Sequence, residues 1–478
     1  MFFSICRSPG CGSFIQEENI EITKTGAGLR VQARCEKNHK TTWSSCEFFN
    51  QGRTSAIDVM IGVYALVIGL NMSQILEFMK QMNIAICSRA SLYRLQSVFV
   101  NPVIFSYWTQ MQKQLQDYLK QIGRPITLTG DGQFDSPGFS ASYCFYSAVE
   151  TTTNKVLDFY VATKNMTEYS AKMEPFATKV IMARLYKSRV NIRVCTTDRS
   201  SLMKKLFKDL NSRLIKRGKM PIKHTYDVWH MVKAVTKDLF QASKLKKCQV
   251  LGDWIRSIAN MMWYAFDYCN GNADLLREMI LSIPDHIADQ HTFPENKLFK
   301  KCLHGDLPKE RAWLKKESLS RKKIVAALRG KKDCRIKDIS MMTEFNHTGV
   351  NEQINNLHNV YLPKNCFFGH PQAVVRAALT CIDHNSNVNR KQALDQDGDG
   401  QYNVVNTRDG LVWTAKPVKE PKNTLWRGEI ATEVLEVNYL SCTSSYNYAC
   451  TRLLYRNNNN IIYFSIFDLG CAKWQSAK

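Results

Sequence analysis

The order of strand-like and helix-like segments in the middle of the chain most constrains its fold. The strand-like segments, in order, are "ITLTGDG", "ASYCFYSAVE", "KVLDFYVATK", "NIRVCTTDRS" and "IKHTYDVWH". Short turn-like stretches separate the first three, whereas helix-like stretches, residues 169–186 and 201–218, precede the fourth and the fifth. This order predicts an antiparallel meander of three strands, extended by strands that helices connect.

The order β-β-β-α-β-α-β is that of the ribonuclease H fold, so we expect an α/β fold with a ribonuclease H-like mixed sheet. Asp131 lies near the end of the first strand, with Asp135 four residues further, and Asp198 ends the fourth strand. If the fourth strand lies beside the first, Asp131 and Asp198 meet at the carboxyl edge of the sheet. Two close carboxylates repel each other unless a cation shares them.

A divalent cation would remove this repulsion. Mg²⁺ or Mn²⁺ takes oxygen ligands from one or two carboxylates together with substrate phosphate. Two such ions can activate a water or a 3′-hydroxyl and stabilise the leaving oxygen of a phosphodiester. A third acid is expected on a later helix, where Glu352 lies in the first turn after Thr348 and Gly349; Glu344 is its rival and Asp227 a weaker candidate.

Four motifs resemble those of eukaryotic cut-and-paste DDE transposases of the Kolobok and Mutator-like kind. They are "GDGQFDSPGFSASY", "TTDRS", "YDVWHMVK" and "FNHTGVNEQINNLHNVYLPK", and the resemblance runs from the N-terminus to about residue 390. It implies strand cleavage and strand transfer by three metal-binding acids, which fall on Asp131, Asp198 and Glu352. It also implies that Asp227 and His230, which match a D-x-x-H signature, lie near the site, as Asp135 would.

The partners that this resemblance implies agree with the charge of the chain. The sequence has 65 Lys and Arg against 42 Asp and Glu, a net charge of +23, which favours a nucleic acid partner. The resemblance implies double-stranded DNA as transposon ends and target, a homo-oligomer in a synaptic complex, and a nuclear location. The sequence has no apolar run of 18 residues, so we do not expect a membrane protein.

Residues 1–50 have the pattern of a zinc ribbon. Two pairs of ligand-type residues flank a segment that alternates polar and apolar residues as a β-hairpin would. The predicted zinc ligands are Cys6, Cys11, Cys35 and His39, and Cys46 is an alternative for one of them. Because "MFFSICRSPGCG" lacks the pattern of a secretory signal, the sixteen cysteines are expected in a reducing compartment, as metal ligands or buried thiols.

Two stretches are candidate DNA-binding surfaces, one for its helical pattern and one for its basic charge. Residues 51–123 are helical in pattern and include a candidate helix-turn-helix, although two packed helices that bridge domains explain the pattern equally well. Residues 199–247 carry 14 Lys and Arg against 3 Asp and Glu. The residues expected to contact DNA are Arg89, Tyr93, Arg94 and Gln96 in the first stretch, and Arg199, Lys204, Lys205 and Lys208 in the second.

The chain is thus expected to hold six segments, with an all-α insertion splitting the ribonuclease H-like core. Their predicted limits are 1–50 (ribbon), 51–123 (helical), 124–230 (core, first part), 231–342 (insertion), 343–390 (core, last part) and 391–478 (small β-rich or irregular). Within the insertion, the aromatic and Met residues are expected in a core. Its remaining metal-ligand types, whose spacing fits no standard knuckle, are expected to pack as ordinary side chains: His286, His291, Cys302 and His304.

Our prediction is therefore a metal-dependent DNA transposase, or a protein derived from one. An alternative is a DNA-binding protein that kept the fold and lost catalysis. A second alternative is a metal-dependent nuclease that cuts without strand transfer. The motifs do not separate these three functions, because joining depends on the assembly of two DNA ends.

Overall fold

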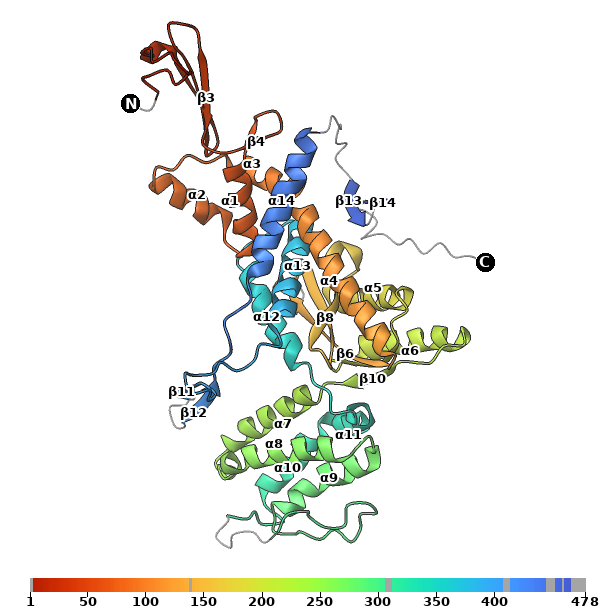
Figure 1. Cartoon of the computed structure of the whole chain (residues 1–478). Helices are drawn as coiled ribbons and strands as arrows, with labels where there is room; N and C mark the ends of the chain where they lie inside the picture. The colour runs from red at the N-terminus through yellow and green to blue at the C-terminus, as the bar shows by residue number, and fades with distance from the viewer. Residues whose placement is uncertain are drawn as a thin grey trace. The chain divides into compact units, whose positions relative to one another are not determined.

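The chain forms two compact units in a computed structural model (Figure 1). One unit consists of Met1–Gln114 with Leu357–Lys478, and the other is Leu115–Asn356. The structure describes residues 3–136, 140–305, 312–406, 413–443, 452–457 and 460–465. In these ranges, no helix is both long and apolar enough to cross a bilayer. Both boundaries between the units, after residues 114 and 356, fall inside helices. The division therefore does not test the predicted segment limits at 123 and 390, which stay predictions.

A five-stranded mixed sheet forms the centre of the second unit. Its strands are β6 (Ile126–Phe134), β7 (Tyr143–Glu150), β8 (Lys155–Thr163), β9 (Ile192–Thr197) and β10 (Lys223–Tyr226). Strands β6, β7 and β8 are antiparallel neighbours, whereas β9 is parallel to β6 and β10 is parallel to β9. The order is β10-β9-β6-β7-β8, so the fourth strand lies beside the first, as predicted.

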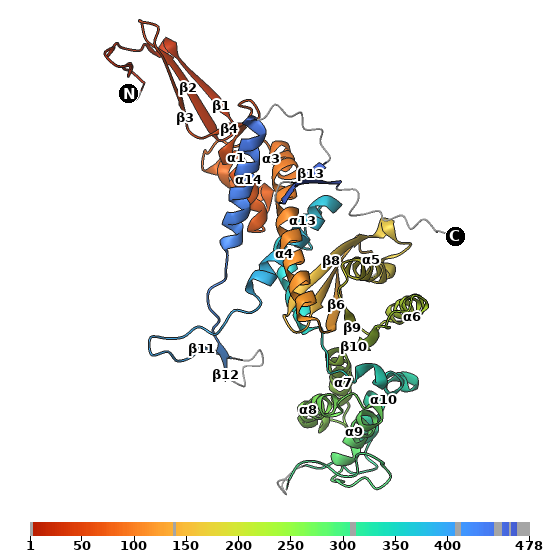
Figure 2. The same ribbon diagram turned by 45° about the vertical axis from the view of Figure 1, so that its right-hand side comes forward.

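Helices cover this sheet because strands β7 and β8 are buried on both faces. Strand β7 is buried from Cys144 to Glu150 and β8 from Val156 to Ala162. Helix α5 (Met173–Lys187) packs along β8 and β7 (Figure 2). Helix α6 (Ser201–Lys216) adds Met203 and Phe207 to the same hydrophobic core. Short 3₁₀ turns, Lys164–Met166 and Ser170–Lys172, lead from β8 into α5.

The predicted insertion is all-helical and has its own hydrophobic core. Its helices are α7 (Val228–Ser243), α8 (Leu251–Tyr268), α9 (Ala273–His286), α10 (Leu319–Arg329) and α11 (Cys334–Lys337), with 3₁₀ turns at Lys331–Asp333 and Ile339–Met342. Trp254, Met262 and Phe266 of α8 are buried in this core. The structure thus confirms that these aromatic and Met residues pack. Helix α12 (Gly349–Tyr361) follows the insertion.

The first unit begins with a three-stranded antiparallel sheet, which confirms the predicted hairpin. After the 3₁₀ turn Glu17–Asn19 come β1 (Ile20–Thr25), β2 (Gly28–Arg34) and β3 (Lys40–Ser44), and then a short pair, β4 (Phe48–Phe49) and β5 (Thr54–Ser55). Gly26, in the turn between β1 and β2, has a φ of +58°, and a Cβ there would lie 1.9 Å from a carboxylate oxygen of Asp58. Only glycine fits this turn.

The predicted helix-turn-helix corresponds to α2 (Met72–Gln81) and α3 (Arg89–Leu95), which follow α1 (Ala56–Val67). A π-helical turn, Gln96–Val100, continues α3 directly into α4 (Asn101–Ile122), because the residues at both junctions have helical dihedral angles. The expectation that Gln96 faces a DNA groove is wrong. Its side chain is buried and donates from Nε2 to the Gly62 carbonyl at 3.0 Å.

The C-terminal part contains helices that its sequence did not predict. They are α13 (His370–Asn387) and α14 (Leu425–Thr443), with the hairpins β11 (Tyr402–Asn406) and β12 (Trp413–Pro417), and β13 (Arg452–Asn457) and β14 (Asn460–Ser465). Trp426, Ile430 and Val434 of α14 are buried, and α14 packs against α1. Residues 391–478 are therefore not only β-rich or irregular, because α14 belongs to the packed first unit.

We predict that Gly130→Ala destabilises the protein by about 1–3 kcal/mol, as overpacking of a filled core does. A Cβ at Gly130 would lie 2.0 Å from the hydroxyl oxygen and 2.6 Å from the Cζ atom of Tyr146, which is buried. Gly252→Ala in α8, where a Cβ meets no atom within 4 Å, is the matched control. Urea unfolding measures both variants, and equal midpoints for the two would contradict the prediction.

Candidate functional site

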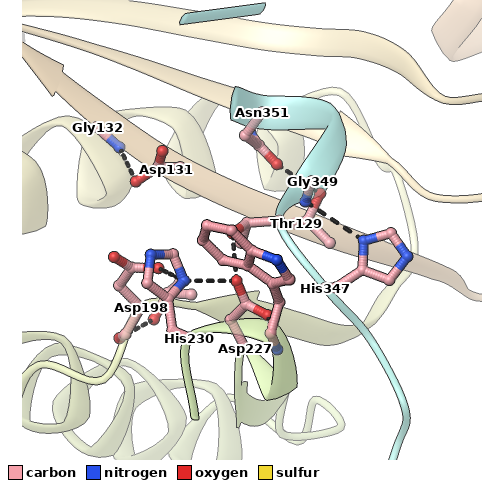
Figure 3. Close-up of polar contacts among 12 residues, drawn as sticks. Thr129, Asp131, Gly132, Asp198, Asp227, His230, His347, Gly349 and Asn351 are labelled. Atoms are coloured by element: carbon pink, nitrogen blue, oxygen red, sulfur yellow. Dashed lines mark hydrogen bonds and ion pairs between the residues drawn. The ribbon is translucent and has the colours of Figure 1, made fainter. Parts of the chain in front are cut away.

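Two aspartates lie near each other where β9 ends beside β6. The parallel register pairs Thr129 with Thr196, so Asp131 and Asp198, each two residues further, lie level on neighbouring segments (Figure 3). The charge of Asp198 is one cause of the raised pKa of Asp131, which confirms that the two carboxylates interact. The predicted meeting of these acids at the carboxyl edge of the sheet is thus observed.

The surroundings of Asp131 hold its carboxylate in place but compensate only part of its negative charge. Oδ1 accepts from the backbone N–H of Gly132 at 2.8 Å, and Oδ2 accepts from Asn355 Nδ2 at 2.7 Å. Desolvation and then the charge of Asp198 raise the pKa of Asp131 to about 7, although these two hydrogen bonds and the charge of His230 act the other way. The site therefore attracts a proton or a metal cation at neutral pH.

A third acid near the aspartates, Glu174 in the first turn of α5, was missed by the sequence analysis. Desolvation, followed by the charges of Asp131 and Asp198, raises the pKa of Glu174 to about 8. Its Oε1 atom is buried without a hydrogen-bond partner in the described part of the chain. A Cβ on Gly132 would lie 3.3 Å from Glu174 Cγ, so the missing side chain of this glycine makes room for the glutamate.

Asp227 and His230 lie beside Asp198, as the D-x-x-H resemblance implies (Figure 3). Asp227 is buried and caps α7 by accepting from the N–H of Trp229 at 2.7 Å. His230 Nδ1 lies 2.6 Å from Asp227 Oδ2 and 3.0 Å from Asp198 Oδ1. Burial alone would lower the pKa of His230, but its hydrogen bonds to Asp198 and Asp227 and their charges raise it to about 10.

These three residues form one of the described groups whose ligand atoms lie close enough to share a metal ion. The imidazolium of His230 offsets part of the negative charge on Asp198. Burial would raise the pKa of Asp227, but hydrogen bonds from His230 and Thr348 lower it, so this carboxylate stays ionised. Asp227 thus orients His230, and His230 in turn holds Asp198.

Helix α12 meets the sheet through two asparagines. Asn351 is buried, accepts from Thr129 Oγ1 at 2.8 Å, and donates to the carbonyl of Ser147 at 2.9 Å. Asn355, one turn further, donates to Asp131. The sequence analysis missed both, although their spacing of four residues places them on one face of the predicted helix. This face fixes α12 against the strand that carries Asp131.

Glu352 is half-buried on the same helix, three residues before Asn355. Within the described ranges, its carboxylate has no hydrogen-bond or ion-pair partner. Its rival Glu344 forms an ion pair with Lys223, the first residue of β10, whereas Asp198 follows the carboxyl end of β9 and Asp131 lies within β6. Asp135 Oδ1 accepts from the N–H of Ser142 at 3.0 Å and so closes the connection after β6. The roles of Glu352 and Asp135 stay predictions.

The four predicted zinc ligands converge at the N-terminus. Cys6, Cys11, Cys35 and His39 offer ligand atoms that all lie within 4.8 Å of one another, and Cys46 is not in this group. His39 Nδ1 lies 3.9 Å from Cys6 Sγ and 3.7 Å from Cys35 Sγ. Hydrogen bonds with Ser13 lower the pKa of Cys11 to about 6, which favours the thiolate that binds metals. This cluster can therefore hold one tetrahedral metal ion.

The basic residues expected at DNA differ in their surroundings. Asp338 accepts from Arg199 Nε at 2.8 Å and from Lys204 Nζ at 3.3 Å, so both cations already have an acidic partner. Lys205 and Lys208 on α6 are exposed to solvent. Arg89 and Arg94 are exposed on α3, and the Arg89 guanidinium lies 5.6 Å from the centre of the half-buried Tyr93 ring. Contact of these seven residues with DNA stays a prediction.

Comparison with known proteins adds one finding. A family model described as Mutator-like transposase matches residues 2–303 of the chain. No curated protein matches the chain. The matched residues include the N-terminal cluster, both aspartates, Glu174 and the D-x-x-H pair, but they end before Glu352. The match therefore does not decide which residue is the third acid.

We predict that Asp131 and Glu174 contribute stability that is lost as the pH rises through about 7 and about 8 in buffer without Mg²⁺ or Mn²⁺. The folded protein keeps protons on Asp131 and Glu174 up to these pH values, because their pKa values are about 7 and about 8. The unfolded chain, with carboxyl pKa values near ~4, has lost these protons. The folded state thus binds more protons at these two groups, and their contribution to stability decreases as the protons are removed.

Glu174→Gln should make this decrease less steep, since it removes one of the two titrating carboxyls. Glu344→Gln, which removes a carboxylate paired with Lys223 outside the site, is the control and should keep the wild-type slope. The measurement is the midpoint of urea unfolding at successive pH values. One slope for all three proteins would show that Glu174 does not hold a proton in the folded state.

Proposed function

The chain belongs to the Mutator-like transposase family, and on that premise we propose that it cleaves and joins DNA strands by divalent-metal catalysis at the edge of its five-stranded sheet. The family supports a transposase function and DNA as the partner. The proposal adds a ribonuclease H-like core, a three-acid site and a requirement for Mg²⁺ or Mn²⁺. The arrangement of strands β6–β10 supports the first of these additions.

The observation that carries the proposal is the pair of carboxylates, Asp131 in β6 and Asp198 just after the parallel β9, with the buried carboxyl group of Glu174 beside them. Asp131 and Asp198 raise each other's need for a cation, and the charges of both raise the pKa of Glu174. Such a set of oxygen ligands suits a hard divalent cation, which would hold substrate phosphate on its free positions. Bound metal would supply an activated water or 3′-hydroxyl and stabilise the leaving oxygen.

The residues of the chain then have distinct roles in this proposal. Asp131 and Asp198 bind the metal ions, and Asn355 orients the Asp131 carboxylate through its 2.7 Å hydrogen bond. His230, held by Asp227, positions Asp198. Glu352 completes the set of acids from α12, the helix that Asn351 fixes on β6 and β7. The carboxylate of Glu352 is available for a metal ion, whereas the carboxylate of Glu344 is already paired with Lys223.

We also propose partners outside the catalytic site. The cluster of Cys6, Cys11, Cys35 and His39 holds a structural zinc ion, because tetrahedral sites of thiolates and imidazole are typical of zinc. Joining two DNA ends requires that both are held together, which we propose a homo-oligomer achieves in a synaptic complex. Action on chromosomal DNA implies a nuclear location.

We predict that the purified chain nicks supercoiled plasmid in Mg²⁺ or Mn²⁺, and that Asp131→Asn, Asp198→Ala and Glu352→Gln each reduce the rate at least about 100-fold. Removing a metal-binding acid removes transition-state stabilisation of several kcal/mol. Glu344→Gln is the matched control and should keep most of the wild-type rate. The assay uses plasmid with and without candidate transposon ends and separates nicked, linear and joined products.

Each outcome of this assay distinguishes between functions. Joined products support a transposase, and cleavage without joining supports a nuclease. A wild-type chain that binds DNA but is inert in both metals contradicts catalysis and leaves a DNA-binding protein. Loss of activity in Glu344→Gln rather than Glu352→Gln would assign the third acid to Glu344.

We predict that Lys205→Ala/Lys208→Ala weakens DNA binding and lowers its dependence on salt. Each phosphate contact contributes about 0.9 to the slope of log K against log salt, so the slope should fall by up to about 2. Lys179→Ala/Lys187→Ala, which removes two exposed lysines from α5, controls for net charge. Fluorescence anisotropy at several salt concentrations measures both slopes. An equal loss in both variants would show a non-specific charge effect rather than contacts from α6.

A further inference from the structure

A second cluster of metal-ligand side chains lies in the helical insertion, away from the aspartates. Its members are His286, His291, Cys302 and His304, and their ligand atoms all lie within 4.8 Å of one another. We expected these side chains to pack separately, because their spacing in the sequence fits no standard knuckle. The structure instead brings all four to one point.

Backbone pairing explains how such unusual spacing converges. His286 is the last residue of α9, and the chain after it folds back on itself through an antiparallel bridge between Thr292 and Lys301. The N–H of Cys302 donates to the carbonyl of His291 at 2.9 Å, which places these two residues side by side. His304 follows in a bend two residues after Cys302, and its Nε2 atom lies 3.2 Å from His291 Nδ1.

The hydrogen bonds at the outer nitrogens of two imidazole rings indicate which ring nitrogens carry a proton. His291 Nε2 lies 3.1 Å from Asp289 Oδ1, and His304 Nδ1 lies 2.7 Å from the carbonyl oxygen of Gly305. Both oxygens accept, so these two nitrogens carry the N–H groups. The inner nitrogens, His291 Nδ1 and His304 Nε2, therefore both present lone pairs, and they lie 3.2 Å apart. In neutral rings these two lone pairs repel each other, and a metal ion between them, or a proton on one ring, would remove the repulsion.

The distances within the cluster fit a tetrahedral ion. With metal–nitrogen bonds of about 2.0–2.1 Å and a metal–sulfur bond of about 2.3 Å, two nitrogen ligands lie about 3.3 Å apart, and nitrogen and sulfur about 3.6 Å apart. The observed separations are 3.2 Å between the inner nitrogens of His291 and His304, and 3.3 Å between His286 Nδ1 and Cys302 Sγ. The other separations among the four ligand atoms are at most 4.8 Å, so a bound metal ion would draw those ligands closer together.

We propose that His286, His291, Cys302 and His304 bind a structural zinc ion. Three imidazoles and one thiolate are borderline and soft ligands in a closed set of four, which suits zinc and disfavours Mg²⁺ or Ca²⁺. The hydrogen bonds from His291 to Asp289 and from His304 to Gly305 are the outer contacts that orient metal-binding histidines. This site is independent of the proposed catalytic metals and of the N-terminal cluster.

The zinc ion has a structural task at this position. The connection between α9 and α10 is long and, in its described residues, contains no helix. At its tip, Glu278 of α9 accepts from the N–H groups of Lys297, Leu298 and Phe299 at 2.8–3.0 Å. Near the helix end, the zinc site joins His286 to both arms of the same loop. Glu278 and the zinc ion thus fasten the loop to α9 at two points.

The test measures zinc in the full chain, purified without a histidine tag and dialysed against metal-free buffer. Inductively coupled plasma mass spectrometry should find two zinc ions per wild-type chain, one for each Cys/His cluster. Cys302→Ser/His304→Ala and Cys35→Ser/His39→Ala should each retain one. Cys366→Ser/His370→Ala, a cysteine and a histidine outside both clusters, is the matched control and should retain two.

The two proposals for zinc separate in this experiment. Zinc content that is unchanged in Cys302→Ser/His304→Ala overturns the site in the insertion, whereas unchanged content in Cys35→Ser/His39→Ala overturns only the N-terminal one. X-ray absorption on the wild type does not depend on the folding of any variant. Two loaded sites give on average two sulfur and two nitrogen ligands per zinc, whereas three sulfurs and one nitrogen would show that only the N-terminal cluster is loaded.

Discussion

The repulsion between the acids at one edge of the sheet is the interaction that the neighbouring residues of the second unit must compensate. Asp131 and Asp198 are brought together by the parallel pairing of β6 and β9, and Glu174 reaches them from α5. Neighbouring groups limit the repulsion: the hydrogen bond from Asn355 and the imidazolium of His230 each compensate part of the charge. Because these groups compensate only part of the negative charge of the acids, the site can form and still attracts a cation.

The fold around these acids was largely readable from the sequence, because strands and helices have different apolar periods. Three successive strand-like runs before any helix predicted the meander, and the first helical crossover placed β9 beside β6. The same reasoning found Asp131 and Asp198, since each directly follows or lies in a strand of clear pattern. It missed α14, where the burial of Trp426 and Ile430 depends on packing against a distant helix.

Other features of the site depend on which surfaces meet, and a periodic pattern does not carry this information. Glu174 looks like an ordinary acid in the first turn of a helix until the side chain missing from Gly132 is seen to admit it. Asn351 and Asn355 become meaningful only when the partners of α12 are known. The cluster at His286 escaped because its spacing is set by a folded-back loop rather than by a knuckle.

In the proposed function, the binding of metal at this site is coupled to the release of protons. Asp131 and Glu174 keep their protons near neutral pH when no metal is bound, so an arriving divalent ion must displace them. Loading is therefore an exchange of protons for metal, and its equilibrium shifts toward the metal-free form as the surroundings become more acidic. This edge of the sheet would therefore release protons each time a divalent ion binds to it.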